Sequence, residues 1–564
     1  MKKGLLLLFL TVMTITVNAQ ATIESTTAGG SGNDWEIGTT WVGGVVPSPT
    51  DNVIINNTVR LNEVDVTIAN ITVAETGRLL LNTRSALTIT GNLVNNRSGG
   101  VKFNNNQTEE MASLIIQGAV SGTGNIQAQY KLASAADPGR WYLMGVPVSG
   151  GTLTDFIAAS TLRTNVGGEN SIGVYDGNAD PKYDYFTDAE AVGINLIDGK
   201  GYAVSVAVGS NEFIEINGQY NSAASVDISI SDAGDGFNLL GNPYAAFLYA
   251  NPDGDATNNL LTANSGVLEE NTIWLYDSAT SAFITRNLGD TGFDLATYQG
   301  FFVKAASGGG TFTFTEAMQT HNNSGSVFYK SANNRFEIDF KITDGENNSN
   351  ASIRYIEGTT TGWDNGYDSS TFTGYATGNL EIATQLVANN VGKNLAIQSL
   401  PNQNLEATVI PLSITAEADK EVTISAAIKN VPEGINVYLE DREANTFTVL
   451  DVANPTFTFT PSKALSGAGR FYLHTKAGSA LSTDTATLDN VSIFNTTNNT
   501  LKIIGLQSGN TSVKMFNILG KQVLTTSFDC NGAKEIALPN VSRGVYVVQV
   551  NNNNGKLSKK IILE

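Results

Sequence analysis

The chain has 564 residues and a formal charge of -20, with 33 Lys and Arg against 53 Asp and Glu. Its length allows about four domains, and its charged share of 15% lies below the usual value of about 25%. Phosphate backbones and anionic lipid surfaces repel a chain of this charge, so we expect no nucleic-acid partner.

The first 19 residues predict a secretory signal peptide. Two lysines precede the apolar stretch GLLLLFLTVMTITV, which is too short to span a bilayer. The small residues Val17 and Ala19 place the cleavage point between Ala19 and Gln20. No later stretch approaches the roughly 18 apolar residues of a membrane span, so we expect no transmembrane helix in the mature chain. The single cysteine, Cys530, excludes an intramolecular disulfide.

Residues 20–130 contain short strand-like runs separated by Gly and Asn turns, among them VIINN, ALTITGNLVNN and SLIIQGAV. Their close spacing favours stacked parallel rungs, and we predict a short β-solenoid. The opening, with Trp35 and Trp41, resembles the cap of such solenoids in surface proteins and is similar to the G8 domain. The two tryptophans either shield the end of the core or form an aromatic platform for sugar rings.

An internal repeat follows, which divides into units at 131–225 and 226–320. WYLMGVPV at residue 141 matches FNLLGNPY at 237, and IGVYD ending at Asp176 matches IWLYD ending at Asp277. The matched segments lie about 100 residues apart, which predicts two related β-units. Gly145 and Gly241 are expected to accept unusual backbone angles at a tight turn.

Two acidic loops, DGNADPKYD at 176–184 and NPDGDATNN at 251–259, are rich in oxygen ligands. No cofactor is expected, and calcium is the one metal that these loops suggest, although neither has the EF-hand pattern. The alternative is that Asp, Asn, Gly and Pro are simply good turn formers. The candidate calcium ligands are Asp176, Asp180, Asp253 and Asp255.

Residues 321–480 alternate polar and apolar residues in NRFEIDFKI, VIPLSI and EVTISAAI, which predicts a β-sandwich. The order of these segments along the chain resembles that of a β-sandwich domain that often precedes the C-terminal domain in secreted proteins. Trp363, Tyr367, Phe372 and Tyr375 lie in a polar segment, where they either stack on sugars or cover a sandwich edge.

Residues 481–564 read as short strands and turns in VKMFNILGKQV, LPNVSRGVYVVQV and the terminal KKIILE, a pattern typical of a small Ig-like sandwich. From residue 488 onward they resemble the type A C-terminal sorting domain of the type IX secretion system. The resemblance assigns the sorting signal to Gly520, Lys521, Gly544, Tyr546, Lys559 and Lys560.

The resemblance implies several partners and a cellular location. The partners are the type IX translocon and its C-terminal signal peptidase. The domain is then removed, and the cargo is released or attached to surface lipopolysaccharide of a Gram-negative cell. We therefore expect a secreted or cell-surface protein at the outer-membrane exterior.

The chain is poor in catalytic residue types. It has two histidines, His321 and His474, neither with a recognisable partner nearby, and no GxSxG, HExxH, GxxxxGK[ST] or GxGxxG motif that would mark an active site. We predict a multidomain, all-β, non-enzymatic protein with an adhesin-like or structural role. The alternatives are an extracellular polysaccharide-binding protein and a glycan-degrading enzyme that uses two carboxylates on the solenoid.

Overall fold

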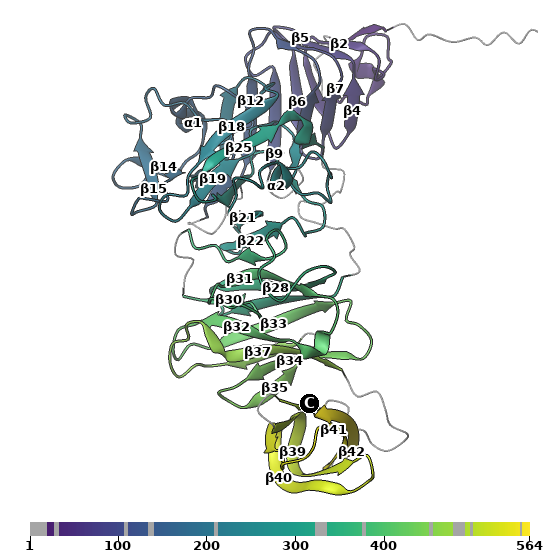
Figure 1. Ribbon diagram of the computed structural model, residues 1–564. Helices are drawn as coiled ribbons and strands as arrows, with labels where there is room; N and C mark the ends of the chain where they lie inside the picture. The colour runs from purple at the N-terminus through teal and green to yellow at the C-terminus, as the bar shows by residue number, and fades with distance from the viewer. Residues whose placement is uncertain are drawn as a thin grey trace, which may run out of the picture.

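The computed structural model describes residues 20–26, 33–106, 111–132, 140–207, 212–321, 335–374, 379–450, 455–477, 491–496, 500–552 and 555–563. The predicted signal peptide and Tyr375 lie outside these residues. The molecule is elongated and all-β, as expected, with the N-terminal sheets at one end and the last five strands at the other (Figure 1). No described helix has the length and apolar character of a bilayer span.

Three parallel sheets form the N-terminal end. They have the orders β1-β2-β5-β8-β11, β3-β6-β9-β12 and β4-β7-β10, so that successive turns of the chain add one strand to each sheet. This pairing agrees with the stacked strands expected for residues 20–130. The strands are β1 (Thr22–Glu24), β2 (Asn52–Ile55), β3 (Thr58–Leu61), β4 (Asp65–Ile68), β5 (Asn70–Val73), β6 (Arg78–Asn82), β7 (Ala86–Ile89), β8 (Leu93–Asn95), β9 (Val101–Asn106), β10 (Ser113–Ile116), β11 (Val120–Ser121) and β12 (Ile126–Lys131), and a 3-10 turn, η1, spans Gly38–Thr40.

Alternate side chains of these strands point inward and form a continuous apolar core. Leu79 and Leu81 of β6, for example, are fully buried. The core does not stop at residue 130, because β12 also pairs antiparallel with β17 (Phe213–Gly218), and Ile214 and Ile216 join the same cluster. The domain boundary that the sequence places at residue 130 therefore remains a prediction.

The two repeated units have the same strand order. The first forms the sheet β13-β16-β14-β15 and the second the sheet β19-β24-β21-β22, with equivalent strands in equivalent places. The repeated sequence motifs therefore correspond to repeated structure. The strands are β13 (Tyr142–Met144), β14 (Glu169–Tyr175), β15 (Tyr183–Thr187), β16 (Tyr202–Val204), β19 (Phe237–Gly241), β21 (Thr272–Asp277), β22 (Ala282–Asn287) and β24 (Gly300–Lys304).

Shorter elements complete these units. They are β18 (Ser225–Ile230) paired with β25 (Gly310–Thr315), the sheet of β23 (Asp294–Leu295), β20 (Phe247–Tyr249) and β26 (Gln319–Thr320), the helices α1 (Leu153–Ala159) and α2 (Leu260–Ala263), and the 3-10 turn η2 (Glu316–Met318). The Thr152 hydroxyl caps α1 by accepting from the backbone N–H of Asp155.

Gly145 and Gly241 are required for a different reason from the one expected. Neither has a positive φ. Instead, a Cβ on Gly145 would lie 2.6 Å from the backbone nitrogen of Asn242, and one on Gly241 would lie 2.3 Å from the Cα of Gly145. The two repeats meet backbone to backbone at these glycines, so the sequence prediction was wrong about the cause.

An aromatic cluster joins the repeats to the following region. Phe372 is 7% exposed, and its ring lies 4.6 Å from Phe237, 4.6 Å from Phe302 and 4.0 Å from Phe283, measured between centroids. Phe372 is therefore neither a sugar platform nor part of a sandwich edge. It completes a core that belongs mostly to the preceding repeats.

Residues 335–477 form one hydrogen-bonded sheet of eleven strands that encloses a shared apolar core, here called the eleven-stranded region. Its order is β35-β34-β37-β32-β30-β31-β28-β27-β33-β36, and β29 also pairs with β31. The strands are β27 (Glu337–Thr343), β28 (Asn348–Ile356), β29 (Ser369–Ser370), β30 (Glu381–Thr384), β31 (Leu395–Pro401), β32 (Val409–Thr415), β33 (Val422–Lys429), β34 (Ile435–Asp441), β35 (Thr446–Val449), β36 (Thr456–Phe459) and β37 (Ala468–Ala477), with the 3-10 turn η3 at Leu405–Ala407.

The last five strands have a core of their own. They are β38 (Ser492–Asn495), β39 (Thr500–Asn517), β40 (Gln522–Ala537), β41 (Gly544–Asn552) and β42 (Gly555–Leu563), in the order β38-β39-β41-β42 with β40 also paired to β39. Bulges in the β39–β40 ladder bend this long hairpin, and Gly505 and Gly509 on β39 have positive φ.

Candidate functional site

The hairpin turn between β39 and β40 holds Gly520 and Lys521, the first pair of the predicted sorting signal. Gly520 has a φ of +76°, which a side chain would strain. The Asn517 side-chain oxygen accepts from the backbone nitrogens of Leu519 and Lys521, at 3.0 and 2.9 Å. The turn is thereby fixed while Leu519 remains 86% exposed at its tip.

Gly544 and Tyr546 lie at the start of β41. Gly544 has a φ of +152°, and Tyr546 is buried against the core of the last five strands. The Tyr546 hydroxyl donates to the backbone oxygen of Ser542 at 2.6 Å, which ties the start of the strand to the preceding loop. A tyrosine bonded back to upstream backbone is a recurring corner of Ig-like sandwiches.

The terminal lysines differ in environment. Lys560 is exposed, whereas burial lowers the pKa of the half-buried Lys559, and the Glu406 carboxylate opposes that shift. Glu406 belongs to η3 of the eleven-stranded region. Lys559 therefore faces the body of the protein, and Lys560 faces solvent.

A buried polar cluster links the last five strands to the body. Lys502 of β39 lies 2.6 Å from Oε1 of Glu440, and Nε2 of His474 lies 2.7 Å from Oε2 of the same carboxylate. Burial opposes ionisation of Glu440, but the hydrogen bonds from His474 and Lys502 outweigh it and hold the pKa of Glu440 at about 2. Burial lowers the pKa of His474. Both pKa shifts fit a neutral His474 ring that donates from Nε2 to an ionised Glu440.

Both histidines thus have partners that the sequence did not reveal. Nδ1 of His321 lies 2.6 Å from the Ser113 hydroxyl, and its Nε2 lies 2.8 Å from the Thr88 hydroxyl. Ser113 is only 2% exposed, so its hydroxyl is shielded from solvent. The contact fastens His321 to β7 and β10.

The four candidate calcium ligands lie in turns and are mostly exposed. One oxygen of Asp176 accepts from the backbone of Asn178, and one oxygen of Asp255 accepts from Thr257 and Asn258. Asp253 accepts from the nitrogen of Gly292 at 2.6 Å, and Asp180 is exposed. These hydrogen bonds suit the turn-forming alternative, and no group of three or more His, Cys, Asp or Glu able to hold a metal occurs among the described residues.

Four of the candidate sugar-binding aromatics, Trp35, Trp41, Trp363 and Tyr367, are not brought together on one surface. Trp35 and Trp41 are 3% and 1% exposed, pack edge to face at 4.9 Å, and share a hydrogen bond from the Trp41 ring to the Trp35 carbonyl. They shield the core and offer no platform, which contradicts the sugar-binding alternative at this end. Trp363 is half-buried beneath Nζ of Lys393 at 4.0 Å, and Tyr367 is 42% exposed.

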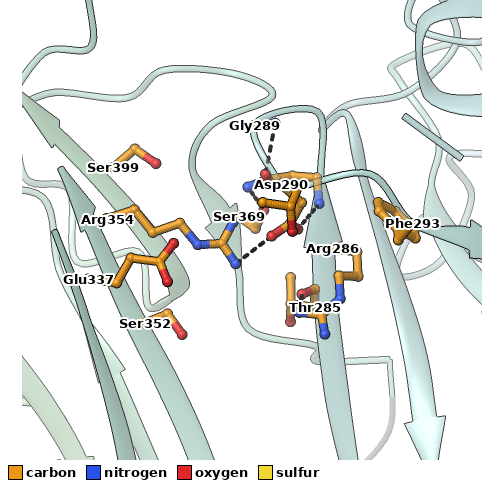
Figure 2. A network of polar contacts seen from close by, with 12 residues as sticks. Thr285, Arg286, Gly289, Asp290, Phe293, Glu337, Ser352, Arg354, Ser369 and Ser399 are labelled. Carbon is orange, nitrogen blue, oxygen red and sulfur yellow. Dashed lines mark hydrogen bonds and ion pairs between the residues drawn. The ribbon is translucent and has the colours of Figure 1, made fainter. Parts of the chain in front are cut away.

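Sequence reasoning also missed the polar junction between the second repeat and the eleven-stranded region (Figure 2). Arg354 of β28 lies 2.6 Å from Oδ1 of Asp290, and the two side chains are 7% and 5% exposed. Arg335 donates to the carbonyl of Gly289 in the same turn at 2.8 Å. The partners are more than forty residues apart, and no local pattern marks them.

A second buried carboxylate holds the same junction. Glu270 is fully buried, accepts from the backbone nitrogen and hydroxyl of Ser370, and lies 2.5 Å from Nζ of Lys393. Nearby, burial raises the pKa of Asp368 to about 7, although this carboxyl accepts from the backbone nitrogens of Ser399 and Asp364. The junction is therefore rich in buried acids that hold loops in place.

Comparison with known proteins agrees with the geometry at the C-terminal end. Residues 488–564 match the secretion system C-terminal sorting domain. The protein is therefore of the exported class that carries a type IX sorting domain, and it is secreted or placed at the cell surface. The chain itself belongs to the family described as domain of unknown function DUF8693, whose model matches residues 26–474.

Solved structures give only faint likenesses. A biofilm associated protein, BSP domain, is 10% identical with a TM-score of 0.17 and is matched over 78% of this chain and 92% of its own. Dimeric latent PorU from Porphyromonas gingivalis is 12% identical with a TM-score of 0.13, over 44% of this chain and 30% of its own. TM-scores this low support no argument about function. No curated protein matches the chain.

Proposed function

We propose that the protein is a non-enzymatic, adhesin-like or structural surface protein, displayed at the outer-membrane exterior of a Gram-negative cell. The supporting observation is the elongated body that ends in the sorting domain (Figure 1). Buried polar contacts lie at two junctions, Asp290 with Arg354 and Glu440 with Lys502, so the body suits the display of its N-terminal end at a distance.

Export follows from residues 488–564 in this proposal. The type IX translocon carries the chain outward, and its C-terminal signal peptidase, of the PorU kind, removes the sorting domain. The body is then released or attached to surface lipopolysaccharide. The fixed turn at Gly520 and the corner at Tyr546 supply a preformed shape for such recognition.

Export is tested by truncation. A chain ending at residue 487 is expected to accumulate inside the cell envelope of a host with this secretion system, while the full chain reaches the surface. Surface labelling with an antibody against the body measures both. Normal display of the truncated chain would refute the assigned route, and an absence of any attachment phenotype in cells displaying the full chain would refute the adhesin-like role.

A further inference from the structure

A ladder of amide side chains crosses the outer face of the sheet β3-β6-β9-β12-β17. Nδ2 of Asn82 donates to Oδ1 of Asn62, and Nδ2 of Asn104 donates to Oδ1 of Asn82 at 3.0 Å. In the next strand Gln129 is in register with Asn104, and its Nε2 donates to Glu215 of β17 at 3.1 Å. A row of amide side chains therefore runs across the parallel part of the sheet and meets Glu215 in its antiparallel part.

A cavity of about 450 Å³ lies where this ladder reaches the ends of β9 and β12 and the start of β17. Its volume is in the range of small-molecule sites. The register places Lys131 between Asn106 on one side and Phe213 on the other. The lining residues are Asn104, Asn105, Asn106, Gln129, Lys131 and Phe213.

Two amides of the cavity, Asn104 and Gln129, retain hydrogen-bonding capacity. A side-chain amide has two N–H groups and a carbonyl, and Asn104 and Gln129 each donate only one N–H to a described neighbour. The side chain of Asn105 lies on the opposite face of β9, is 1% exposed and accepts from the nitrogen of Ala112 at 2.7 Å, so it belongs to the core. The remaining N–H and carbonyl groups of Asn104 and Gln129 can therefore bond a ligand.

The charge available in the cavity is positive, in contrast to the negative chain. Glu215 is 8% exposed, and its oxygens are occupied by Gln127 at 2.6 Å, Gln129 at 3.1 Å and the more distant Lys102 at 3.8 Å. Lys131 is exposed and makes no ion pair within the described part of the chain. Phe213 adds a half-buried ring beside it.

We propose that this cavity binds a carboxylated sugar unit, a uronic acid, within an extracellular glycan. The Asn104 and Gln129 amides bond its hydroxyl groups, Phe213 packs against its ring, and Lys131 pairs with its carboxylate. The inference rests on the proposed surface role only for the source of the glycan. It gives that role a ligand class and involves no covalent step.

The test is calorimetric titration of the purified full chain with trimers of galacturonic acid and of mannuronic acid, and with their methyl esters. At least one acidic trimer is expected to bind about 3- to 5-fold more tightly than its ester, which is what one exposed ion pair contributes. Absence of binding by both acidic trimers up to about 10 mM would overturn the site.

Variants separate the roles within the site. Lys131→Gln is expected to abolish the preference for the acidic trimer, while Lys131→Arg keeps it. Phe213→Leu is expected to weaken acid and ester equally. Lys341→Gln, an exposed lysine on β27, is the matched control and should bind as the wild type does. An unchanged preference in Lys131→Gln with an unchanged melting temperature would overturn the assignment.

Failure of the proposed sugar site can be distinguished from failure of the proposed surface role. Titration in solution does not depend on export, so loss of surface display leaves the binding result intact. Conversely, cells that display the chain and fail to attach, while the purified chain binds the acidic trimer, refute the adhesin-like role and leave the site standing.

Discussion

The substitution Asp290→Asn tests whether the buried ion pair with Arg354 holds the second repeat against the eleven-stranded region. In the native turn, one Asp290 oxygen faces Nη2 of Arg354 at 2.6 Å, and the other accepts from the backbone nitrogen of Asn287 at 2.9 Å. Asparagine has a single side-chain oxygen, so its amide nitrogen must face one of these donors. The variant therefore loses a hydrogen bond as well as the charge.

The magnitude follows from burial. With both side chains less than a tenth exposed, solvent screens the pair little, and removing one partner of a buried pair costs about 3–5 kcal/mol. Nη1 of Arg354 already has no hydrogen-bond partner among the described residues, so the variant leaves a further donor of the buried guanidinium unpaired. Arg354→Met in the same chain removes the stranded charge, and the double variant is expected to recover part of the loss.

Urea unfolding of the full chain, followed by tryptophan fluorescence, measures the free energies for a double-mutant cycle. Glu63→Gln is the matched control, because its ion pair with Arg84 is exposed at 61% and 48% and is expected to contribute less than about 1 kcal/mol. If Asp290→Asn costs no more than this control, the argument that the pair fixes the junction is wrong.

Two further predictions concern the buried carboxyl of Asp368 and the ring of Trp41, which covers the N-terminal end of the core. Burial raises the pKa of Asp368 to about 7 from 3.8, so the folded state holds its proton more tightly and stability should fall by up to about 1.4 kcal/mol per pH unit as the pH rises from 4 to 7. Urea titrations at pH 5, 6 and 7 should show a steeper fall in the wild type than in Asp368→Asn, and equal slopes would contradict the shift. Trp41→Ala removes a fully buried ring and its bond to Trp35, and should cost about 3–5 kcal/mol by thermal or urea unfolding. A loss below about 1 kcal/mol would show that the ring does not support the core.

Local and periodic features of the fold were predictable from the sequence. Alternation of apolar residues identified the strands, because a residue such as Leu79 must point inward on a half-buried sheet. The duplicated WYLMGVPV and FNLLGNPY segments predicted two related units, and these have the same strand order. The reason for Gly145 and Gly241 was missed, since close contact between distant backbones leaves no local signature.

The candidate site was less predictable, because its contacts are long-range. The Gly520 turn and Tyr546 were found through a contiguous motif. The pairing of Glu440 with His474 and Lys502, in contrast, joins three strands, and neither charge nor spacing identifies it. Burial was equally invisible: Trp41 looks the same in sequence whether it caps a core or faces solvent.

Because of the position of Phe372, the repeats cannot complete their aromatic core until a later segment of the chain is present. The Phe372 ring fills the aromatic cluster around Phe237 and Phe302, yet it lies 70 residues beyond Phe302 in the chain. At a synthesis rate of about 5–20 residues per second, Phe372 is made about 4–14 s after Phe302. Because the chain is exported, the apolar face around Phe302 stays uncovered until the segment with Phe372 has also been delivered, which gives a chaperone on the export route time to bind before the repeats close.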